Sequence, residues 1–259
     1  MSKSTLSNRA RDEVKRLRRR DYRLKTGRTI AEGYPEVTRA IAAGIAVDLL
    51  YICPEIIQPR NGEFDNQPIV EITKKEFATI AFGEQSKGIL AICRFQTYQL
   101  ADLKLKAEPF LVIIDSIEKP GNLGTIIRCA DGSGADGVIM CDARTDVYNH
   151  NIVRASLGAV FSLKTVAATK EETLDFCRKK GIAVFATTSK AEKNYYDCPL
   201  AKASAIVVGS EHEGLSDFWL ENAGQKIKIP MQGVSTSLNA AMSASIIMYE
   251  AFRQRQVAH

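Results

Sequence analysis

The chain has 259 residues, of which 45% are hydrophobic and 25% charged, and its formal net charge at pH 7 is +5. This composition is ordinary for a globular protein, and the length allows two modest domains. No apolar run approaches the roughly 20 residues that a membrane helix needs, and the basic N-terminus lacks the apolar core of a signal peptide. We therefore expect a cytoplasmic protein that does not contact a membrane.

The cysteines and histidines exclude two further classes. The six cysteines are scattered without a C-x-x-C pair, and the histidines are His150, His212 and His259. In a chain that is not secreted, such cysteines are expected to be buried thiols, not a disulfide framework. No Cys/His group has the spacing of zinc ligands, so we expect no metal. His212, in "EHE", is interpreted as a solvated loop residue instead of a general base.

Positive charge is concentrated near the N-terminus. Between Arg9 and Arg28, ten Lys and Arg residues stand against three acidic ones, a local net charge of +7. Such a block is typical of contact with a nucleic-acid phosphate backbone. A solvated helical face is the alternative interpretation. The segment indicates affinity for nucleic acid and says nothing about chemistry.

The first third of the chain reads as a small alternating α/β unit. Apolar positions between Val37 and Ile45 recur at helical spacing and predict a helix. The elements expected after it are a strand at 47–53, a loop at 54–68, a strand at 69–73, a helix at 74–81 and a strand at 88–95. The polar segment 97–109 has no clear period and predicts a connection between domains, here 1–105 and 106–259.

The remainder alternates strands with helices. The strands expected are 110–115, 136–142, 161–168, 182–188, 205–209 and 225–230, with helices at 124–134 and 169–181. A long amphipathic helix closes the chain, and its apolar face is predicted to hold Leu238, Ala241, Met242, Ser245, Ile246, Tyr249 and Phe252. This alternation predicts a mostly parallel sheet covered by helices on both sides.

One glycine motif invites a dinucleotide interpretation. "GSGADG", residues 132–137, fits G-x-G-x-x-G letter for letter. A pyrophosphate site requires the motif to follow a strand and open a helix, whereas this one follows a helix and leads into a strand. We therefore interpret Gly132 as a helix C-cap and Gly134 as part of a tight turn that needs positive φ.

Three segments place polar residues where strands end, which is where ligands of open α/β sheets bind. The loop after 110–115 presents Asn122 and leads at Gly124–Thr125 into a helix with Arg128 on its first turn. A second segment places Gly209 and Glu211 just after a strand, with Gly214 beyond them. The third gathers Ser235, Thr236, Ser237 and Asn239 before the last helix. Turn formation, an interface salt bridge and helix capping are the alternative, purely structural interpretations.

These segments also carry a resemblance. "IDSIEKPGNLGTIIRCADGSGADGV", "VVGSEHEGLS" and "IPMQGVSTSLNAAMSASIIMYE", in this order, resemble the three motifs of the SpoU (TrmH-like) family in the SPOUT superfamily. Its members are RNA 2′-O-ribose methyltransferases that use S-adenosylmethionine. The resemblance covers the chain from about Phe110 to the end, and "VRASLGAVF" (153–161) is also similar to a family segment. The N-terminal part resembles the ribosomal-protein-like domain with which many members bind their substrate.

The resemblance implies an α/β fold, with a C-terminal trefoil-knotted methyltransferase domain, a smaller N-terminal RNA-binding domain, and a homodimer formed through the last helix. The residues that match the family's catalytic positions are Asn122, Arg128, Glu211, Ser237 and Asn239. Those that match its cofactor-binding positions are Thr187, Gly209, Ile229, Met231 and Leu238. Family proposals make the arginine a general base. We favour a phosphate clamp, because a guanidinium keeps its proton at neutral pH.

The resemblance further implies methylation of RNA, with 23S rRNA favoured because a separate N-terminal domain is associated with large rRNA substrates. Three alternatives stay open on the sequence alone. These are a tRNA 2′-O-methyltransferase, an antibiotic-resistance methyltransferase with the same two domains, and an RNA-binding factor without catalytic activity.

Overall fold

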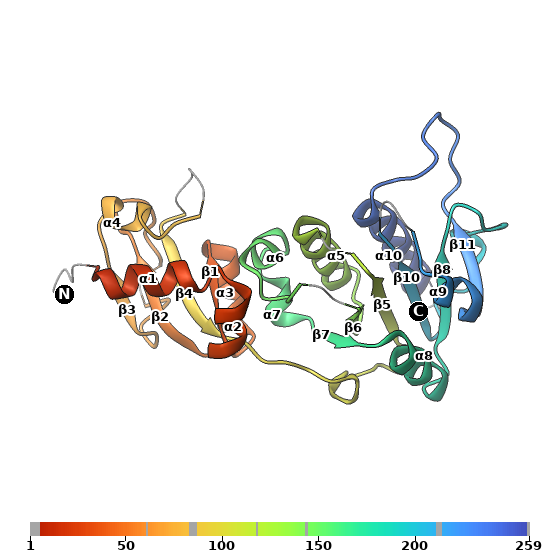
Figure 1. The fold of residues 1–259 in the computed structure, drawn as a ribbon, viewed down its shortest axis with the longest axis horizontal. Coiled ribbons are helices and arrows are strands. Elements are labelled where there is room, and N and C mark those ends of the chain that lie inside the picture. The colour runs from red at the N-terminus through yellow and green to blue at the C-terminus, as the bar shows by residue number, and fades with distance from the viewer. Residues whose placement is uncertain are drawn as a thin grey trace. The chain divides into compact units, whose positions relative to one another are not determined.

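The computed structural model describes residues 6–60, 62–82, 87–117, 119–142, 145–210 and 214–257. The chain forms two compact units (Figure 1). Unit 1 comprises Met1–Gln96 together with Asp146–Ser162, and unit 2 comprises Thr97–Thr145 together with Leu163–His259. The boundary expected between residues 105 and 106 stays a prediction.

Unit 1 is built on a mixed four-stranded sheet of order β1-β4-β2-β3. Its strands are β1 (Arg28–Glu32), β2 (Val47–Ile52), β3 (Ile69–Glu71) and β4 (Ile89–Arg94). Strand β4 runs antiparallel to both β1 and β2, and β3 runs parallel to β2. The helices are α1 (Asn8–Arg16), α2 (Arg20–Thr26), α3 (Tyr34–Ala42), α4 (Lys74–Ala78), α6 (His150–Ala155) and α7 (Ala159–Ser162). The predicted α3, α4 and three strands are confirmed, whereas β1, α6 and α7 were not predicted.

The basic N-terminal segment is a folded part of unit 1. Val14 and Leu17 are fully buried and belong to the core that also contains Phe77 and Ile80. The backbone N–H of Leu6 donates a hydrogen bond to Glu76 Oε1 at 2.9 Å. Apolar positions on one side of α1 therefore fix the helix to unit 1, and its cations occupy the remaining surface.

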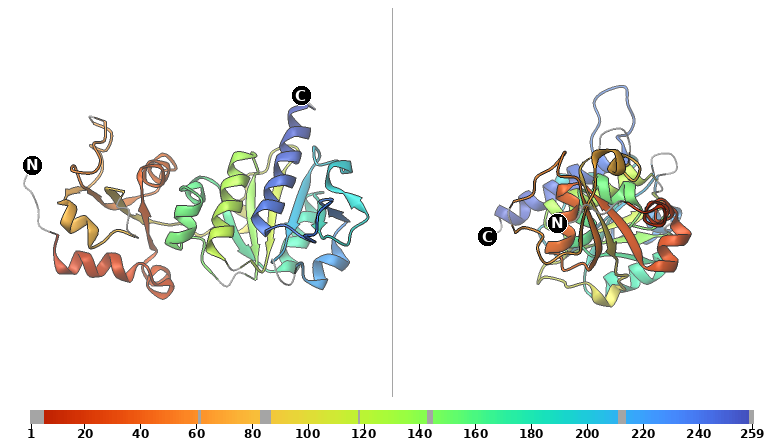
Figure 2. Two further views of the ribbon diagram at one scale, coloured as in Figure 1. Left: turned by 90° about the horizontal axis from the view of Figure 1, so that it is seen from above. Right: turned by 90° about the vertical axis from the view of Figure 1, so that its left-hand side faces the viewer.

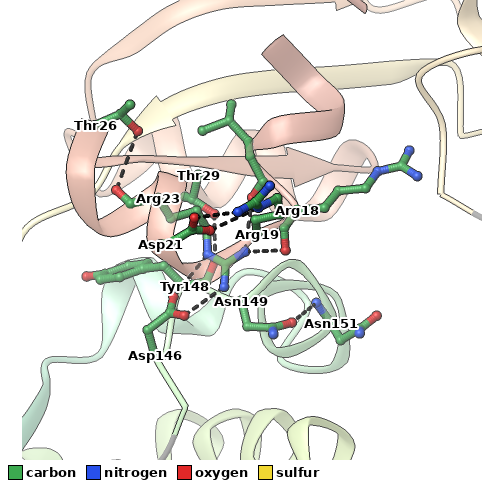
Figure 3. A network of polar contacts seen from close by, with 11 residues as sticks. Arg18, Arg19, Asp21, Arg23, Thr26, Thr29, Asp146, Tyr148, Asn149 and Asn151 are labelled. Atoms are coloured by element: carbon green, nitrogen blue, oxygen red, sulfur yellow. Dashed lines mark hydrogen bonds and ion pairs between the residues drawn. The ribbon is translucent and has the colours of Figure 1, made fainter. Parts of the chain in front are cut away.

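Arg23 is an exception among those cations, because its side chain is only 1% exposed. Its Nε and Nη2 donate to the two carboxylate oxygens of Asp146 at 3.1 and 2.7 Å (Figure 3). Its Nη1 donates to the carbonyl oxygens of Leu17 and Arg18 at 3.0 and 2.7 Å. A charge that the sequence assigns to the nucleic-acid-binding segment thus holds segment 146–162 in unit 1.

Further contacts fasten the same segment. Thr29 Oγ1 donates to the carbonyl oxygen of Tyr148 at 2.6 Å. Arg39 Nη1 donates to the carbonyl oxygen of Leu157 at 2.8 Å. Gly158, at φ +82°, packs so closely on α3 that a Cβ there would lie 2.9 Å from the Cα of Glu36. Segment 146–162 is therefore an integral part of unit 1, although it lies between β6 and β7 of unit 2 in the sequence.

Unit 2 contains a seven-stranded sheet of order β7-β6-β5-β10-β8-β11-β9. The strands are β5 (Phe110–Asp115), β6 (Gly137–Cys141), β7 (Thr165–Ala168), β8 (Ala183–Thr187), β9 (Lys193–Asn194), β10 (Ser204–Val208) and β11 (Gln225–Lys228). All neighbouring strands are parallel. The predicted parallel sheet and six of its strands are confirmed, and only the two-residue β9 was not predicted. The trefoil knot stays a prediction.

Helices cover both faces of this sheet. They are α5 (Pro120–Gly132), α8 (Lys170–Lys179), α9 (Asp217–Asn222) and α10 (Ala240–Val257), with short 3-10 turns η1 (Leu100–Asp102) and η2 (Tyr195–Asp197). Leu174 of α8 and Trp219 of α9 pack in the core with Leu111 and Ile113 of the interior strand β5. Helices α5 and α10 pack against each other on the opposite face (Figure 2).

The "GSGADG" segment connects the end of a helix to the start of a strand, so it is not a dinucleotide-binding motif. Helix α5 ends at Gly132 and β6 begins at Gly137, so the motif follows a helix and precedes a strand. Gly134 has φ +73°, as the turn interpretation requires. The helix cap is Ser133, so the C-cap predicted at Gly132 was placed one residue too early.

The apolar face predicted for the last helix is wrong. Helix α10 buries Ala240, Ala241, Ala244, Ile247, Met248 and Ala251. Of the seven residues predicted on that face, Ala241 is 3% exposed, whereas Met242 is 56%, Tyr249 49% and Phe252 36% exposed, and Leu238 precedes the helix. Small alanines face α5 and the sheet because they permit close packing, which leaves larger apolar side chains on the outer side.

The remaining expectations concern thiols, metals and membranes. All six cysteines are free, five of them buried, and Cys129 is partly exposed. Across the described ranges no group of three or more His, Cys, Asp or Glu residues is placed to hold a metal ion. No helix within those ranges is long and apolar enough to cross a bilayer.

Candidate functional site

A cavity of about 420 Å³ opens at the carboxyl ends of β8, β10 and β11. It lies where open α/β sheets bind ligands, and its volume is in the range of small-molecule sites. Its lining is mainly apolar side chains, hydroxyl groups and glycine backbone, contributed by Thr187, Thr188, Ser189, Lys190, Val208, Gly209, Ser210, Gly214, Leu215, Leu220, Ile227, Ile229, Met231, Thr236, Ser237, Leu238, Ala240, Ser243 and Ile247.

The five predicted cofactor-binding residues all line this one cavity. Thr187 ends β8 and Gly209 follows β10. Ile229 and Met231 follow β11, and Leu238 precedes α10. The structure therefore brings together four segments that are far apart in the sequence. Their role as cofactor contacts stays a prediction.

A larger hollow, of about 730 Å³, lies elsewhere in unit 2. It is lined by segment 99–105 and by charged residues of α8 such as Glu172, Asp175 and Lys179. Among the described residues it contains none of the predicted site residues. We take the smaller cavity as the candidate site although its volume is lower, because it lies at the carboxyl ends of the strands and is lined by the predicted cofactor-binding residues.

The loop after β10 is closed tightly at its base. Ser210 N donates to Gly214 O at 3.0 Å, and Gly214 N donates to Ser210 O at 3.1 Å. A Cβ on Gly209 would lie only 2.1 Å from Gly214 O, so no larger residue fits without moving the loop. Gly214 itself has φ +71°, which favours glycine. Both glycines that the sequence singled out are therefore required by the backbone of this loop.

Hydroxyl groups fix the neighbouring wall of the cavity. Thr187 Oγ1 donates to Val207 O at 2.7 Å and so links β8 to β10. Thr188 N donates to Ile227 O at 2.9 Å, which continues the pairing of β8 with β11. The hydroxyl proton of Thr187 is thus engaged within the sheet, and its oxygen is what it can present as an acceptor to a ligand.

Asn122 and Asn239 meet at the edge of the site. Asn239 Nδ2 donates to Asn122 Oδ1 at 3.3 Å. Asn239 Oδ1 accepts from the backbone N–H groups of Ala241 and Met242 at 2.9 and 3.3 Å, which caps the start of α10. The helix capping considered for this segment is therefore performed by Asn239, whose Oδ1 caps α10 and whose Nδ2 binds Asn122.

Arg128 lies on the outer side of α5. The helix begins at Pro120, earlier than expected, so Arg128 stands on its third turn and not on its first. Its side chain is exposed, and within the described part of the chain its guanidinium makes no hydrogen bond or ion pair. The next residue, Cys129, is joined to α10 because Ser245 Oγ contacts Cys129 Sγ at 3.1 Å.

The two other candidate catalytic residues are Ser237 and Glu211. Ser237 is exposed and lines the cavity. Glu211 lies outside the described residues, as does His212.

One residue that positions the site was not predicted. Asp115, at the end of β5, is 1% exposed, and its Oδ2 accepts from Ser216 N at 2.8 Å. It ties the segment after β10 to the strand that leads to Asn122. The signal that the sequence offers is an acidic residue directly after a fully apolar strand, where a carboxylate needs a buried partner.

Comparison with known proteins places this geometry in a family. Residues 109–249 match the model described as "SpoU rRNA Methylase family". Residues 12–91 match the model described as "MRM3-like substrate binding domain". A relative in Bacillus subtilis (strain 168), the 23S rRNA (guanosine(2553)-2′-O)-methyltransferase RlmP, is 28% identical over 91% of this chain and 92% of its own length.

Two solved structures match this chain over 96–97% of its length. A structure described as an RNA 2′-O ribose methyltransferase is 34% identical, with a TM-score of 0.85, and the match covers 97% of this chain and 98% of the other. An AdoMet-bound rRNA methyltransferase from Sinorhizobium meliloti is 28% identical, with a TM-score of 0.86, and covers 96% and 97% respectively. With this agreement in sequence and fold, the chain belongs to the SpoU rRNA methylase family.

Proposed function

We propose that this chain is a cytoplasmic S-adenosylmethionine-dependent methyltransferase that methylates a ribose 2′-hydroxyl in 23S rRNA. The observation that carries the proposal is the single cavity lined by Thr187, Gly209, Ile229, Met231 and Leu238 in a member of the SpoU family. The rRNA substrate is supported by similarity to RlmP over both units of the chain.

The lining of the cavity suits S-adenosylmethionine. Ile227, Leu215 and Leu238 offer apolar surface for an adenine ring. Gly209, which lines the cavity, can offer its backbone polar atoms to the cofactor. The chemistry that the cofactor supplies when bound is an electrophilic methyl group on a sulfonium, whose sulfur departs neutral. No acid is needed at that sulfur, so alignment of the ribose hydroxyl carries much of the barrier reduction.

The residues around the cavity are assigned to positioning. Asn122 and Asn239, which are hydrogen-bonded to each other, orient the ribose and the loops that present it. Ser237 hydrogen-bonds within the site. Glu211, which lies outside the described residues, keeps its predicted role of fixing the cofactor loop or Arg128.

Arg128 is assigned to the phosphate beside the target ribose. An exposed guanidinium without a partner among the described residues is free to form a bidentate pair with that phosphate. The proton of the hydroxyl then passes to solvent or a neighbouring group. Arg128→Lys tests this role, because a lysine cannot reproduce the fork. Near-normal activity with the rising limb of the pH profile moved to lower pH, as the lower pKa of a lysine requires, would favour a general base instead.

Unit 1 supplies affinity for RNA in this proposal. Six cations of the N-terminal segment are exposed, namely Arg9, Lys15, Arg16, Arg19, Arg20 and Lys25. Such a surface contacts phosphates irrespective of sequence, and a folded RNA shape is then recognised by the rest of the unit. The double variant Arg16→Gln/Arg20→Gln should weaken RNA binding and lower its salt dependence, whereas Arg178→Gln on α8 should change neither.

The outer side of α10 is proposed as the interface of a homodimer. The exposed side of this helix carries the apolar side chains of Met242, Tyr249 and Phe252, in addition to the apolar residues on its buried side. An exposed patch of this kind marks an interaction site, and the two-fold interface of a homodimer places the same helix on both sides.

The decisive experiment is methyl transfer from labelled S-adenosylmethionine to unmodified rRNA, large ribosomal subunits and, separately, tRNA. Wild type and Asn122→Ala/Arg128→Ala are compared. Label in rRNA that resists alkali at one dinucleotide, and that the double variant loses, establishes the reaction and locates its target. Label in tRNA alone would overturn the rRNA assignment. Absence of cofactor binding would leave a non-catalytic RNA-binding factor.

A further inference from the structure

One side chain in the cavity differs from all the others that line it. Among the described lining residues, Lys190 alone carries a charge, and the rest are apolar, hydroxyl-bearing or glycine. Lys190 belongs to the turn that connects β8, which ends at Thr187, with the short strand β9, which begins at Lys193. A cation at the wall of a cavity whose other described lining groups are uncharged predicts that the ligand carries an anionic group near it.

The backbone around Lys190 is fixed although its side chain is exposed. Lys190 N donates to Thr188 Oγ1 at 3.3 Å, and Ala191 N donates to Thr188 O at 3.2 Å. Thr188 is itself paired with β11 through Ile227 O at 2.9 Å. Ala191 is only 6% exposed, so the turn is anchored on its far side as well. The backbone of Lys190 is therefore held beside the cavity by hydrogen bonds that connect its turn to the sheet.

The ammonium group of Lys190, in contrast, has no hydrogen bond or ion pair with any residue that the structure describes. The nearby Lys193 differs, because its Nζ contacts Gln225 Oε1 at 3.5 Å. Other lysines of unit 2 pair with acidic residues, as Lys170 does with Asp142 at 2.9 Å. Lys190 is thus the available cation at the cavity among the described residues.

We propose that Lys190 Nζ binds the α-carboxylate of S-adenosylmethionine. This assignment rests on the proposed function, since it takes the cavity to be the cofactor site. The cofactor carries one anionic group, its carboxylate, and two cationic ones, the α-ammonium and the sulfonium. A lysine beside the sulfonium would repel the reactive centre, so the favourable position for Lys190 is the amino-acid tail. Lys190 then binds the cofactor and takes no part in proton transfer.

Binding of two ligands that differ in a single group tests the proposal. S-adenosylmethionine and its decarboxylated form are titrated calorimetrically into wild type, Lys190→Met and the control Lys226→Met, an exposed lysine outside the cavity. Lys190→Met should bind S-adenosylmethionine about tenfold more weakly, because a charge-assisted hydrogen bond is lost. It should bind the decarboxylated form as well as wild type does, or better. Lys226→Met should bind both normally.

The outcomes separate this inference from the proposed function. Equal losses for both ligands, or no loss for either, would overturn the role of Lys190 while leaving the cofactor site intact. A gain in affinity for S-adenosylmethionine over S-adenosylhomocysteine in Lys190→Met would place the lysine beside the sulfonium and also overturn it. Failure of the wild-type protein to bind S-adenosylmethionine would contradict the cofactor site itself. Unchanged thermal unfolding of both variants shows that they are folded.

Discussion

Asn239 donates a hydrogen bond from Nδ2 to Asn122 Oδ1 at 3.3 Å, which joins two residues 117 positions apart in the sequence. The same Asn239 caps α10 through Oδ1. One carboxamide thus fixes the start of the last helix and contacts the first turn of α5, in which Asn122 lies. These two tasks use different atoms, so substitution can separate them.

Asn239→Asp keeps an acceptor for the cap and loses the donor to Asn122, whereas Asn239→Ala loses both. We expect both variants to lose methyl transfer, because the two motif segments are no longer joined. Only Asn239→Ala should lose about 1 kcal/mol of unfolding free energy, the usual effect of removing an N-cap. Urea unfolding and transfer of labelled methyl measure the two properties. Equal destabilisation by both substitutions would contradict the division of tasks.

Gly209→Ala tests how closely the loop after β10 is packed. The new Cβ would lie 2.1 Å from Gly214 O, so the loop must shift away from the cavity. We expect binding of S-adenosylhomocysteine to weaken about tenfold or more, since overpacking of this kind costs about 1–3 kcal/mol. Gly224→Ala is the matched control, because its Cβ would lie 3.6 Å from the nearest atom, Val184 O. Normal calorimetric binding by Gly209→Ala would show that the loop does not form the site.

The buried ion pair of unit 1 predicts a large effect on stability. Arg23 and Asp146 are 1% and 10% exposed in their side chains, and each single substitution leaves the other charge buried without compensation. Arg23→Met and Asp146→Asn should each lower the unfolding free energy by about 3 kcal/mol. The double variant should lose less than the sum of the two. Additive losses in denaturant unfolding would show that the pair does not act as a unit.

The buried Glu32 predicts a pH dependence of stability. Burial raises the pKa of Glu32 from 4.5 to about 7, although the hydrogen bond that its carboxylate accepts from Phe82 N–H opposes the shift. Arg154 and Arg18 also oppose it, and Glu36 adds to it. The folded state then binds more protons than the unfolded state between these pH values, so this group's contribution to stability is lost as pH rises through 7.

Glu32→Gln removes this titration and retains an acceptor for Phe82 N–H. The variant should match wild type near pH 4 and exceed its unfolding free energy by about 3 kcal/mol at pH 8. Burial also lowers the pKa of His150 to about 4, but this effect is common to both proteins and cancels in their difference. A difference that stays constant from pH 5 to pH 8 would show that Glu32 does not titrate in this way.

The proposed dimer is tested by charge on the outer side of α10. Tyr249 is 49% exposed on this helix, and Tyr196, 47% exposed, lies outside it. Tyr249→Asp should halve the mass in sedimentation equilibrium, because a buried unpaired carboxylate destabilises an apolar interface. Tyr196→Asp should leave the mass unchanged. A monomeric wild-type protein, or a dimer that tolerates Tyr249→Asp, would remove α10 from the interface.

Local sequence patterns predicted the architecture because the decisive strands are uninterrupted apolar runs. Strand β5, "FLVIID", is buried at every position, and such a run between polar segments has few alternative structures. Strand β1, "RTIAE", was missed because it is short and directly continues the basic segment. Helices α6, α7 and α9 were not predicted; each has no more than six residues and carries at most a weak helical period, whereas the equally short α4 was predicted within a longer segment, 74–81.

Other features depend on tertiary structure that no local pattern contains. The buried side of α10 was assigned wrongly because apolar residues stand on more than one side of the helix, and periodicity does not say which side meets the sheet. The partner of Arg23 lies 123 positions away, so its structural role was hidden within a block of cations. In the site, motif positions led to the cavity, whereas the partner of Asp115, Ser216, lies 101 positions away and is visible only in the structure.

The chain passes between its two units three times, after Gln96, after Thr145 and after Ser162. Because each unit is formed by two separate segments of the chain, a chimaera with a single fusion point cannot replace one complete unit by that of another protein. An intact graft must carry Asp146–Ser162 along with the first 96 residues, or supply a substitute in which Asp146 and Tyr148 still meet Arg23 and Thr29. Recombination among relatives is constrained in the same way, so new substrate preferences in this architecture should arise by point substitution more readily than by shuffling of whole segments.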